Sequence, residues 1–193
     1  MERYILRQNI KRFREVLAEE TDPRVRATFS ELLGDSRRKL ALLESSTLGA
    51  PLEVERFSVG RKPAYLVKSI RDHLEQSREC LLLIDPRPGL RIVEVSESYA
   101  SATLTDRARI SGERMFDVFP DNPDLVDADG VSNLYQSLVQ AARTGRRDIM
   151  PIQRYDVRDP NGIFVERRWL PQNVPLFDDC GRLLYLLHHV RSI

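Results

Sequence analysis

The alternation of short apolar runs with turn residues in residues 79–193 constrains the fold of this chain more than any other feature. Two strand-like runs come first, several short helices and one long helical pattern follow, and three more strand-like runs close the chain. Strand pairs on either side of helices are typical of an α+β domain, with a five-stranded antiparallel sheet and the helices on one face. The expected strands are 79–85, 91–95, 148–157, 164–170 and 183–190, and the expected long helix is 131–145.

Residues 1–46 have a helical period and form the first expected domain. Apolar residues recur at steps of three and four, and the sequence EETDPRVR interrupts the pattern. Asp22 is suited to cap a second helix, and Pro23 to its first position, where the missing N–H would have no partner. Two amphipathic helices with a short connection predict an antiparallel helical hairpin.

Residues 47–78 are expected to connect the hairpin to the sheet domain. Their first part is rich in Gly and Pro and is typical of a linker. An amphipathic helix follows, with an apolar stripe formed by Leu66, Val67, Ile70 and Leu74. A helix of this length is not stable alone. We therefore expect the stripe to pack against a second copy of the chain or against a partner.

The charge and cysteine content exclude several classes of protein. A net charge of +1 argues against broad electrostatic binding of nucleic acid, although the charge is uneven. Residues 1–78 contain 16 Lys or Arg and 12 Asp or Glu, whereas residues 79–193 contain 14 and 17. Cys80 and Cys180 are too few for a disulfide framework, and no apolar run reaches membrane-spanning length. We expect a reduced, cytoplasmic protein with no membrane contact.

Two stretches of the sheet domain carry a resemblance to a known family. VSESYASATLTDRARISGERMFDVFPDNPD resembles the part of PAS domains in which a strand ends, a short helix carries a buried aromatic residue and a G-x-x-x-F pattern follows. MPIQRYDVRDPNGIFVERRWLPQNVPLFDDCGRLLYLLHHV is similar to the closing hairpins of PAS domains in bacterial sensor histidine kinases. The resemblance covers residues 79–193 and implies a five-stranded sensory domain. The helical hairpin resembles segments common in alphaproteobacterial proteins, which assigns it no chemistry.

The resemblance also has consequences for the presence of an effector domain and for cofactors. PAS segments are usually followed by an Asp-Ile-Thr junction and an effector helix, whereas this chain ends in RSI, so we expect no effector domain in it. The flavin-binding branch of the family requires a cysteine where residues 104–118 have none. The haem-binding branch uses a histidine on the long helix, where residues 131–145 have Tyr135 but no histidine. We expect no cofactor, with haem held by Tyr135 or His188, or another small molecule, as the alternative.

Two adjacent histidines and a nearby cysteine invite a metal or nucleophile interpretation. His188 and His189 are consecutive in an expected strand, so their side chains point to opposite faces of the sheet. Cys180 precedes His188 by eight residues, roughly 26 Å of extended chain, so the three side chains do not converge on one ion. The sequence contains no recognisable catalytic motif either. We expect no metal site, no catalytic residue and no enzymatic activity.

A small-molecule pocket between the long helix and the sheet is a further expectation. Tyr135 and Leu138 are its candidate walls on the helix, and Arg154, Trp169 and His188 are candidate polar or aromatic groups on the strands. The alternative is that these residues only fill or cover the core, with Arg154 paired to Glu166 across adjacent strands.

The sequence thus predicts a PAS-type sensory domain that acts through protein–protein contact. The expected partners are a second copy of the chain, through the stripe of residues 66–74, and a signalling protein such as a kinase or a regulator. A small-molecule or cofactor sensor is the first alternative. A transcriptional regulator that binds DNA through the basic hairpin is the second alternative, although the near-zero net charge argues against nucleic acid as a partner. The basic residues concerned are Arg24, Arg26, Arg37, Arg38 and Lys39.

Overall fold

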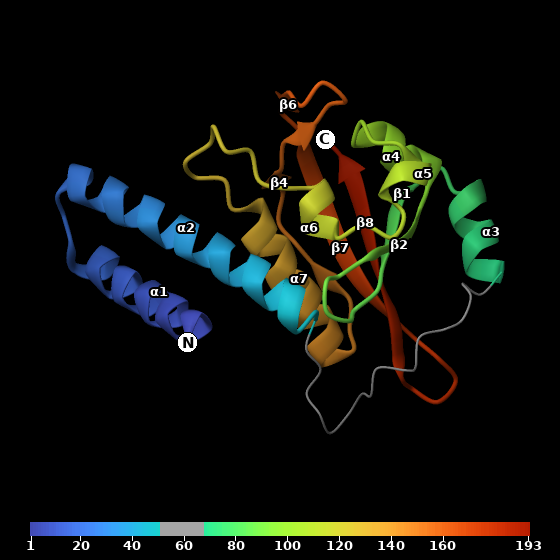
Figure 1. Cartoon of the computed structure of the whole chain (residues 1–193), viewed down its shortest axis with the longest axis horizontal. Helices are drawn as coiled ribbons and strands as arrows, with labels where there is room; N and C mark the ends of the chain where they lie inside the picture. Colours follow the sequence, from blue (N-terminus) through green and yellow to red (C-terminus); the bar gives the residue numbers. More distant parts are fainter. Residues whose placement is uncertain (51–67) are drawn as a thin grey trace.

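Helices α1 (Glu2–Glu19) and α2 (Pro23–Thr47) form the predicted hairpin in the computed structural model, which describes residues 1–50 and 68–193 (Figure 1). Phe13 and Phe29 pack edge to face between the two helices, with ring centroids 5.7 Å apart. Asp22 caps α2, because its carboxylate accepts a hydrogen bond from the backbone N–H of Arg24 at 2.8 Å. Pro23 occupies the first helical position, as its fixed φ favours.

A single antiparallel sheet organises the rest of the chain. Its strands follow the order β2-β1-β8-β7-β3, and β4 also pairs with β7. Two further strands, β5 and β6, pair with each other outside this sheet. The strands are β1 (Cys80–Ile84), β2 (Ile92–Val95), β3 (Asp148–Ile149), β4 (Gln153–Arg154), β5 (Val157–Arg158), β6 (Phe164–Val165), β7 (Arg168–Phe177) and β8 (Leu183–Ser192).

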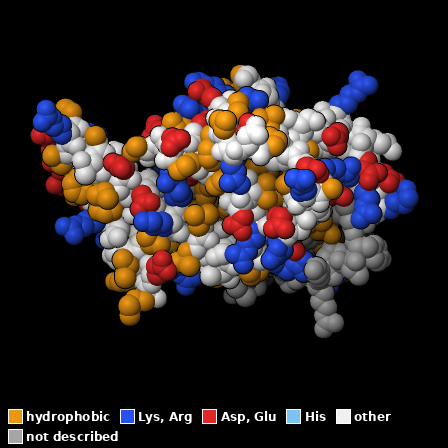
Figure 2. Space-filling view, turned by 45° about the horizontal axis from the view of Figure 1, so that its top comes forward, with side chains coloured by type: hydrophobic (Ala, Val, Ile, Leu, Met, Phe, Trp, Pro, Cys, Tyr) orange, Lys and Arg blue, Asp and Glu red, His pale blue; other side chains and the backbone are white. Residues whose placement is uncertain are grey.

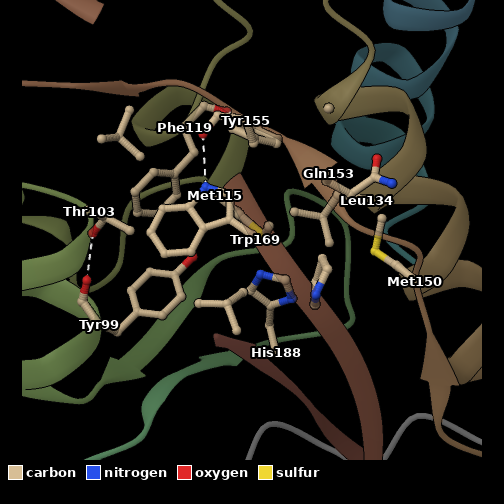
Figure 3. Close-up of a pocket in the computed structure, with 14 residues that line it drawn as sticks. Tyr99, Thr103, Met115, Phe119, Leu134, Met150, Gln153, Tyr155, Trp169 and His188 are labelled. Atoms are coloured by element: carbon tan, nitrogen blue, oxygen red, sulfur yellow. Dashed lines mark hydrogen bonds between the residues drawn. The ribbon is translucent and has the colours of Figure 1, made fainter. Parts of the chain in front are cut away.

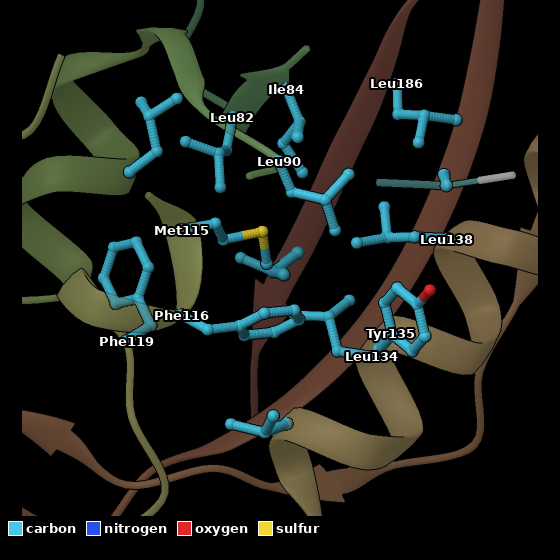
Figure 4. Packing of buried hydrophobic residues seen from close by; sticks show 14 of the residues in the cluster. Leu82, Ile84, Leu90, Met115, Phe116, Phe119, Leu134, Tyr135, Leu138 and Leu186 are labelled. Atoms are coloured by element: carbon cyan, nitrogen blue, oxygen red, sulfur yellow. The ribbon is translucent and has the colours of Figure 1, made fainter. Parts of the chain in front are cut away.

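Four helices cover one face of the sheet and enclose the main core (Figures 1 and 4). They are α4 (Glu97–Ala102), α5 (Arg107–Ile110), α6 (Met115–Val118) and α7 (Gly130–Thr144). Ser96 caps α4 by accepting a hydrogen bond from the backbone N–H of Tyr99 at 3.1 Å. Leu82 and Leu186 of the sheet meet Met115 and Leu138 of the helices, and all four side chains are fully buried. This arrangement confirms the predicted α+β fold.

The opposite face of the sheet holds a smaller apolar cluster. Helix α3 (Lys68–Gln76) lies there, and Leu74 packs with Leu81, Leu83 and Tyr185. Leu74 is only 1% exposed, so its side chain is buried against the sheet of its own chain. Ile70 is half-buried in the same cluster. The other two members of the predicted stripe, Leu66 and Val67, lie outside the described residues.

The hairpin docks on the sheet domain through polar side chains of α2 and through Ala41, which is buried in the main core. Arg38 binds Asp121 at 2.8 Å through Nε and donates from Nη2 to the carbonyl of Ala128 at 2.6 Å. Arg37 donates to the side-chain oxygen of Asn133, at the start of α7, at 3.0 Å. Several of the basic residues predicted to form a solvent-facing or nucleic-acid-binding face thus contact the chain itself.

The predicted strand 148–157 was wrong as a single element. It is divided into β3, β4 and β5, and Pro151 lies in the gap between the first two. Proline has no N–H to donate to a ladder, and the chain changes course at such a position. The ladder resumes at β4, which pairs with β7 through Gln153 and Trp169.

The predicted strand 164–170 was also wrong, because β6 ends at Val165 and β7 continues to Phe177 through two prolines. The backbone N–H and C=O of one residue in an antiparallel strand point to the same side. The carbonyl of Pro171 accepts a hydrogen bond from Met150 at 3.0 Å, so Pro171 faces the β3 side and not β8. Pro175, four residues on, faces the same way. Neither missing N–H therefore interrupts the pairing of β7 with β8.

Two glycine substitutions test the packing of α7 on the sheet domain. At Gly130 an added Cβ would lie 2.3 Å from Cδ2 of Tyr155, so Gly130→Ala is expected to lower the free energy of unfolding by about 1–3 kcal/mol. At Gly34, within α2, nothing lies within 4 Å of the added atom, so Gly34→Ala is expected to raise it by about 0.5–1 kcal/mol. Urea denaturation measures both changes. Equal effects at the two sites would contradict the packing of Tyr155 on Gly130.

Candidate functional site

The two adjacent histidines of β8 occupy opposite faces of the sheet. His188 faces the helices and is 4% exposed, and its ring lies edge to face with that of Tyr99, with centroids 6.1 Å apart. His189 faces the other side, where its Nδ1 lies 2.6 Å from Nε2 of Gln172. Strand alternation therefore separates the pair, and only His188 reaches the interior.

His188 borders a small cavity between the sheet and the helices (Figure 3). The cavity has a volume of about 40 Å³, which accommodates about three or four waters at roughly 10–15 Å³ each. Sites for drug-sized ligands are about 300–1,000 Å³. A larger ligand therefore requires movement of the lining side chains. Half of these are aromatic or contain sulfur, namely Tyr99, Met115, Phe119, Met150, Tyr155, Trp169 and His188, and the others are Thr103, Gly130, Leu134, Gln153, Val157, Pro171 and Val190.

A chain of hydrogen bonds fixes the orientation of His188. Its Nδ1 lies 2.8 Å from Oδ1 of Asn173, the residue directly opposite on β7. Nδ2 of Asn173 donates to Oγ of Ser137 on α7 at 2.7 Å, and the Ser137 hydroxyl donates to the carboxylate of Asp148 on β3. Because Asn173 donates from Nδ2, its Oδ1 accepts the proton of His188 Nδ1. Nε2 is then an acceptor that borders the cavity, and no residue in the described part of the chain donates to it.

Burial keeps His188 neutral. Desolvation, with a smaller contribution from the nearby His189, lowers the pKa of His188 from 6.5 to about 3. Burial likewise raises the pKa values of Tyr99 and Tyr155. The cavity is thus lined by groups that stay uncharged at neutral pH, and it favours a neutral occupant with a hydrogen-bond donor for Nε2 of His188.

Three other polar side chains around the cavity are already engaged. Nε1 of Trp169 donates to the backbone carbonyl of Tyr155 at 2.9 Å, and the Tyr155 hydroxyl donates to the carbonyl of Phe119. Gln153 accepts from Nδ2 of Asn133 at 2.9 Å. These bonds fix the side chains in place. Two polar groups at the cavity have no hydrogen-bond partner among the described residues, Nε2 of His188 and the hydroxyl of Tyr99, so they are the atoms most able to orient a bound molecule.

The structure brings two of the five predicted pocket residues together at the cavity, Trp169 and His188. Leu138 is fully buried in the core. The hydroxyl of Tyr135 turns toward the hairpin and donates to the carbonyl of Gly49 at 2.9 Å. Arg154 lies away from the cavity, where its guanidinium binds carboxylates of neighbouring residues. These are Asp156 at 3.1 Å and Glu166 at 3.2 Å.

Sequence reasoning missed Asn173, Tyr99 and Tyr155. Asn173 is fully buried between two inward-facing prolines of β7. The alternation of Trp169, Pro171, Asn173 and Pro175 was the available signal, because an amide on a buried face requires a buried partner. The predicted strand ended at residue 170, so residues 171–175 were not assigned to a strand and their alternation was not recognised.

Within residues 1–50 and 68–193, no group of three or more His, Cys, Asp or Glu side chains is placed to hold a metal ion. No helix in the same ranges is long and apolar enough to cross a membrane. Cys80 and Cys180 are both free, and Cys180 is exposed.

Comparison with known proteins gives a family and several similar structures. A family model described as PAS fold matches residues 74–193. A substituted form of RsLOV is similar over 65% of this chain and 66% of that chain, with 17% identity and a TM-score of 0.52. The Rhodobacter sphaeroides LOV protein has 16% identity and a TM-score of 0.50 over 65% of this chain and 66% of that chain.

A PAS domain from the fruit-fly ELK potassium channel is also similar, with 14% identity and a TM-score of 0.49 over 67% of this chain and 98% of that chain. The match to RsLOV spans just under two thirds of that protein's length. No curated protein sequence matches this chain. Structural likeness at these identities supports the fold alone.

The buried histidine predicts a specific pH dependence of stability. The pKa of His188 is lower in the folded protein than in the unfolded chain, so the unfolded chain binds the proton more readily between about pH 3 and 6.5. The stabilisation is complete above pH 6.5 and is lost as the pH falls through this window. The expected loss is about 2 kcal/mol of unfolding free energy by pH 5, at roughly 1.4 kcal/mol per pH unit.

Urea denaturation at pH 7.5 and pH 5 of the wild type, His188→Gln and His189→Gln measures this contribution. His188→Gln removes the titrating group and is expected to flatten the pH dependence. His189→Gln, on the face of the sheet opposite helices α4–α7, is expected to keep the pH dependence of the wild type. If the unfolding free energy of His188→Gln fell with pH as steeply as that of the wild type, other groups would cause the acid destabilisation.

Proposed function

This chain belongs to the PAS family, and from that premise we propose that it is a sensory module whose output is contact with a second copy of itself. The proposed contact uses the open face of the sheet, opposite α4–α7, together with the flank of α3. The proposal includes no catalytic role and no resident cofactor. It also places the protein in the cytoplasm, a reducing compartment that suits its two free cysteines.

The observation that carries the proposal is a half-covered apolar surface. Helix α3 shields the open face over β1 and β2, and its apolar cluster extends to Tyr185 and Leu187 of β8. Val174 and Leu170 of β7 and Ile149 of β3 are not part of that cluster. Val174 and Leu187 are directly opposite each other in the ladder, and both are half-buried. Leu170 is also half-buried, and Ile149 is 60% exposed. Exposed apolar patches of this kind typically mark interaction sites.

A groove of about 540 Å³ runs across the same face, lined in part by Ile149, Leu170, Gln172 and His189. The groove also carries Arg78, Glu79 and Arg191, whereas the neighbouring pair Val174 and Leu187 is apolar. Apolar groups and opposite charges could therefore meet their counterparts across a two-fold axis. A second copy is therefore the proposed occupant. A kinase or regulator remains an outcome of the test below.

Strand β8 connects the cavity to this surface. His188 borders the cavity, whereas its neighbours Leu187 and His189 face outward. A shift of β8 that accompanies a change in the cavity therefore alters the contact surface directly. The input acts by changing the populations of two packings of the sheet and its partner.

A small-molecule sensor is the second candidate, and the open acceptor on His188 is what favours it. Native mass spectrometry and the absorbance spectrum of the purified protein test it together. A carried ligand, or an absorbance band in the visible range, would favour this function over the cofactor-free module.

The basic hairpin supports a structural role more than a DNA-binding one. Nη1 of Arg26 donates to the carbonyls of Leu17 and Glu20, both at 2.7 Å. Lys39 pairs with Asp35 at 2.7 Å. With Arg37 and Arg38 engaged in docking as well, few cations of the predicted face remain for phosphate contacts, and we propose no nucleic-acid partner.

The dimer surface is tested by placing charge at its centre. The double variant Val174→Glu/Leu187→Glu is expected to weaken self-association at least about tenfold, which corresponds to 1.4 kcal/mol, because the new carboxylates would be buried in the contact. Ile163→Glu is the matched control, since Ile163 is 64% exposed and follows β5 outside the sheet. Sedimentation equilibrium measures the dissociation constants, and circular dichroism checks the fold.

A wild-type protein that stays monomeric at its highest soluble concentration would contradict the homodimer. An equal loss of association in Ile163→Glu would place the contact elsewhere.

A further inference from the structure

A second surface lies on the hairpin, away from the open face of the sheet. Helices α1 and α7 both pack against α2, and a groove of about 760 Å³ runs between the three helices. Its floor is apolar and includes Ile10, Leu40, Ala41 and Val139. In Figure 1 the hairpin and α3 lie at opposite ends of the molecule, so this groove is separate from the proposed dimer surface.

The rims of the groove carry an excess of positive charge. Five lining residues are basic, and two are acidic. Both acids are already engaged, since Glu44 pairs with Arg7 at 2.7 Å and Glu15 lies 3.9 Å from Lys11. The remaining basic residues have no carboxylate partner among the residues that the structure describes, and they are Arg14, Arg37 and Arg143. Figure 2 shows basic and hydrophobic side chains side by side over the hairpin, at the left of the view.

Arg37 provides an independent indication of a missing acceptor. Its Nη2 donates to Asn133, but its Nε is buried and has no hydrogen-bond partner within residues 1–50 and 68–193. Buried donors in folded proteins are nearly always paired, because an unpaired one costs about 1–3 kcal/mol. Because this Nε is shielded from solvent, an acceptor oxygen in the groove could pair with it only after a shift of the Arg37 side chain.

We propose that this groove binds an amphipathic helix of a partner protein that carries acidic residues along its flanks. Two helices of the hairpin and α7 form three sides of a bundle, and a fourth helix would complete it. Its apolar face would pack on Ile10, Leu40 and Val139. Its carboxylates would pair with Arg14 on one rim and with Arg143 on the other. This is the helix-in-groove mode of recognition, with charge setting the orientation.

Among residues 1–50 and 68–193, a second copy of the chain offers no helix of nine residues or more with a net negative charge, since α3, the shortest of these, carries two basic and two acidic residues. Helices α1 and α2 each carry five basic and three acidic residues, and the charged residue of α7 is Arg143. The three long helices are therefore net positive, and the groove would repel them. The inference goes beyond the proposed sensory function, because it concerns a different surface and a different partner.

A designed peptide tests the proposal on the full chain. The probe is a fluorescein-labelled amphipathic helix with leucines on one face and glutamates on its flanks, and fluorescence anisotropy measures its dissociation constant. We expect saturable binding that weakens as salt is raised, and at least tenfold weaker binding by Arg14→Glu and by Arg143→Glu. Arg12→Glu is the matched control, because Arg12 is exposed on the same helix but does not line the groove, and it should bind nearly as well as the wild type.

Two control peptides define the chemistry. A peptide with glutamine in place of each glutamate, and a scrambled acidic peptide with no amphipathic face, should both bind at least tenfold more weakly. Equal binding of the scrambled peptide would reduce the groove to a general anion site and overturn the helix assignment. No binding at low salt, or an equal loss in Arg12→Glu, would also overturn it.

The outcome is independent of the dimer test. Val174→Glu/Leu187→Glu alters the open sheet face alone, so it should bind the peptide like the wild type. If Arg14→Glu instead weakened self-association, a second copy would be the occupant and the proposal would be wrong.

Discussion

The register of β7 on β8 is the constraint on which the rest of the structure depends. It places Asn173 opposite His188 on the buried face and Val174 opposite Leu187 on the open face. A slip of one residue would exchange the two faces, exposing the amide–imidazole pair and burying the apolar contact. Two features stabilise this register. The prolines of β7 face the β3 side, so every hydrogen bond between β7 and β8 can form, and Asn173 is held on the buried face by its hydrogen bond to Ser137 on α7. The cavity and the interaction surface are thus two results of one pairing.

Helix α7 connects the sheet domain to the hairpin. Ser137 on one side of the helix bonds Asn173 and Asp148, whereas Tyr135 reaches back to the carbonyl of Gly49 at the end of α2. Val139 and Arg143 line the groove against α1 and α2. A movement of α7 relative to the sheet would therefore disturb the polar chain behind His188 and the shape of the groove together. This supplies a physical link between the two proposed surfaces without any contact between them.

The sequence predicted features that depend on local patterns and missed those that depend on register. The cap at Asp22, the hairpin and the order of strands and helices follow from spacing along the chain, and the structure contains them. The direction of a side chain in a late strand follows from where that strand begins and ends. Because β7 was ended at residue 170, Asn173 had no assigned face and the partner of His188 could not be identified. Arg154 was placed at the pocket for the same reason, since its strand was taken to be continuous across Pro151.

The protonation state of His188 limits how the cavity can respond to a signal. A pKa of about 3 means that the charged form is strongly disfavoured while the ring stays buried beside Tyr99 and Trp169. Protonation near neutral pH therefore requires the site to open, and so does any occupant larger than a few waters. Met115 and Met150 are the adaptable members of the lining, whereas Trp169 and Tyr155 are held by bonds to backbone carbonyls. A ligand is thus expected to enter the cavity beside Met115 and Met150, next to α6 and β3. Ser137 on α7 and Asp148 on β3 belong to the hydrogen-bond chain that orients the His188 ring. An opening of the cavity beside β3 would strain these bonds, and because β3 pairs with β7, the displacement would extend to β7 and β8.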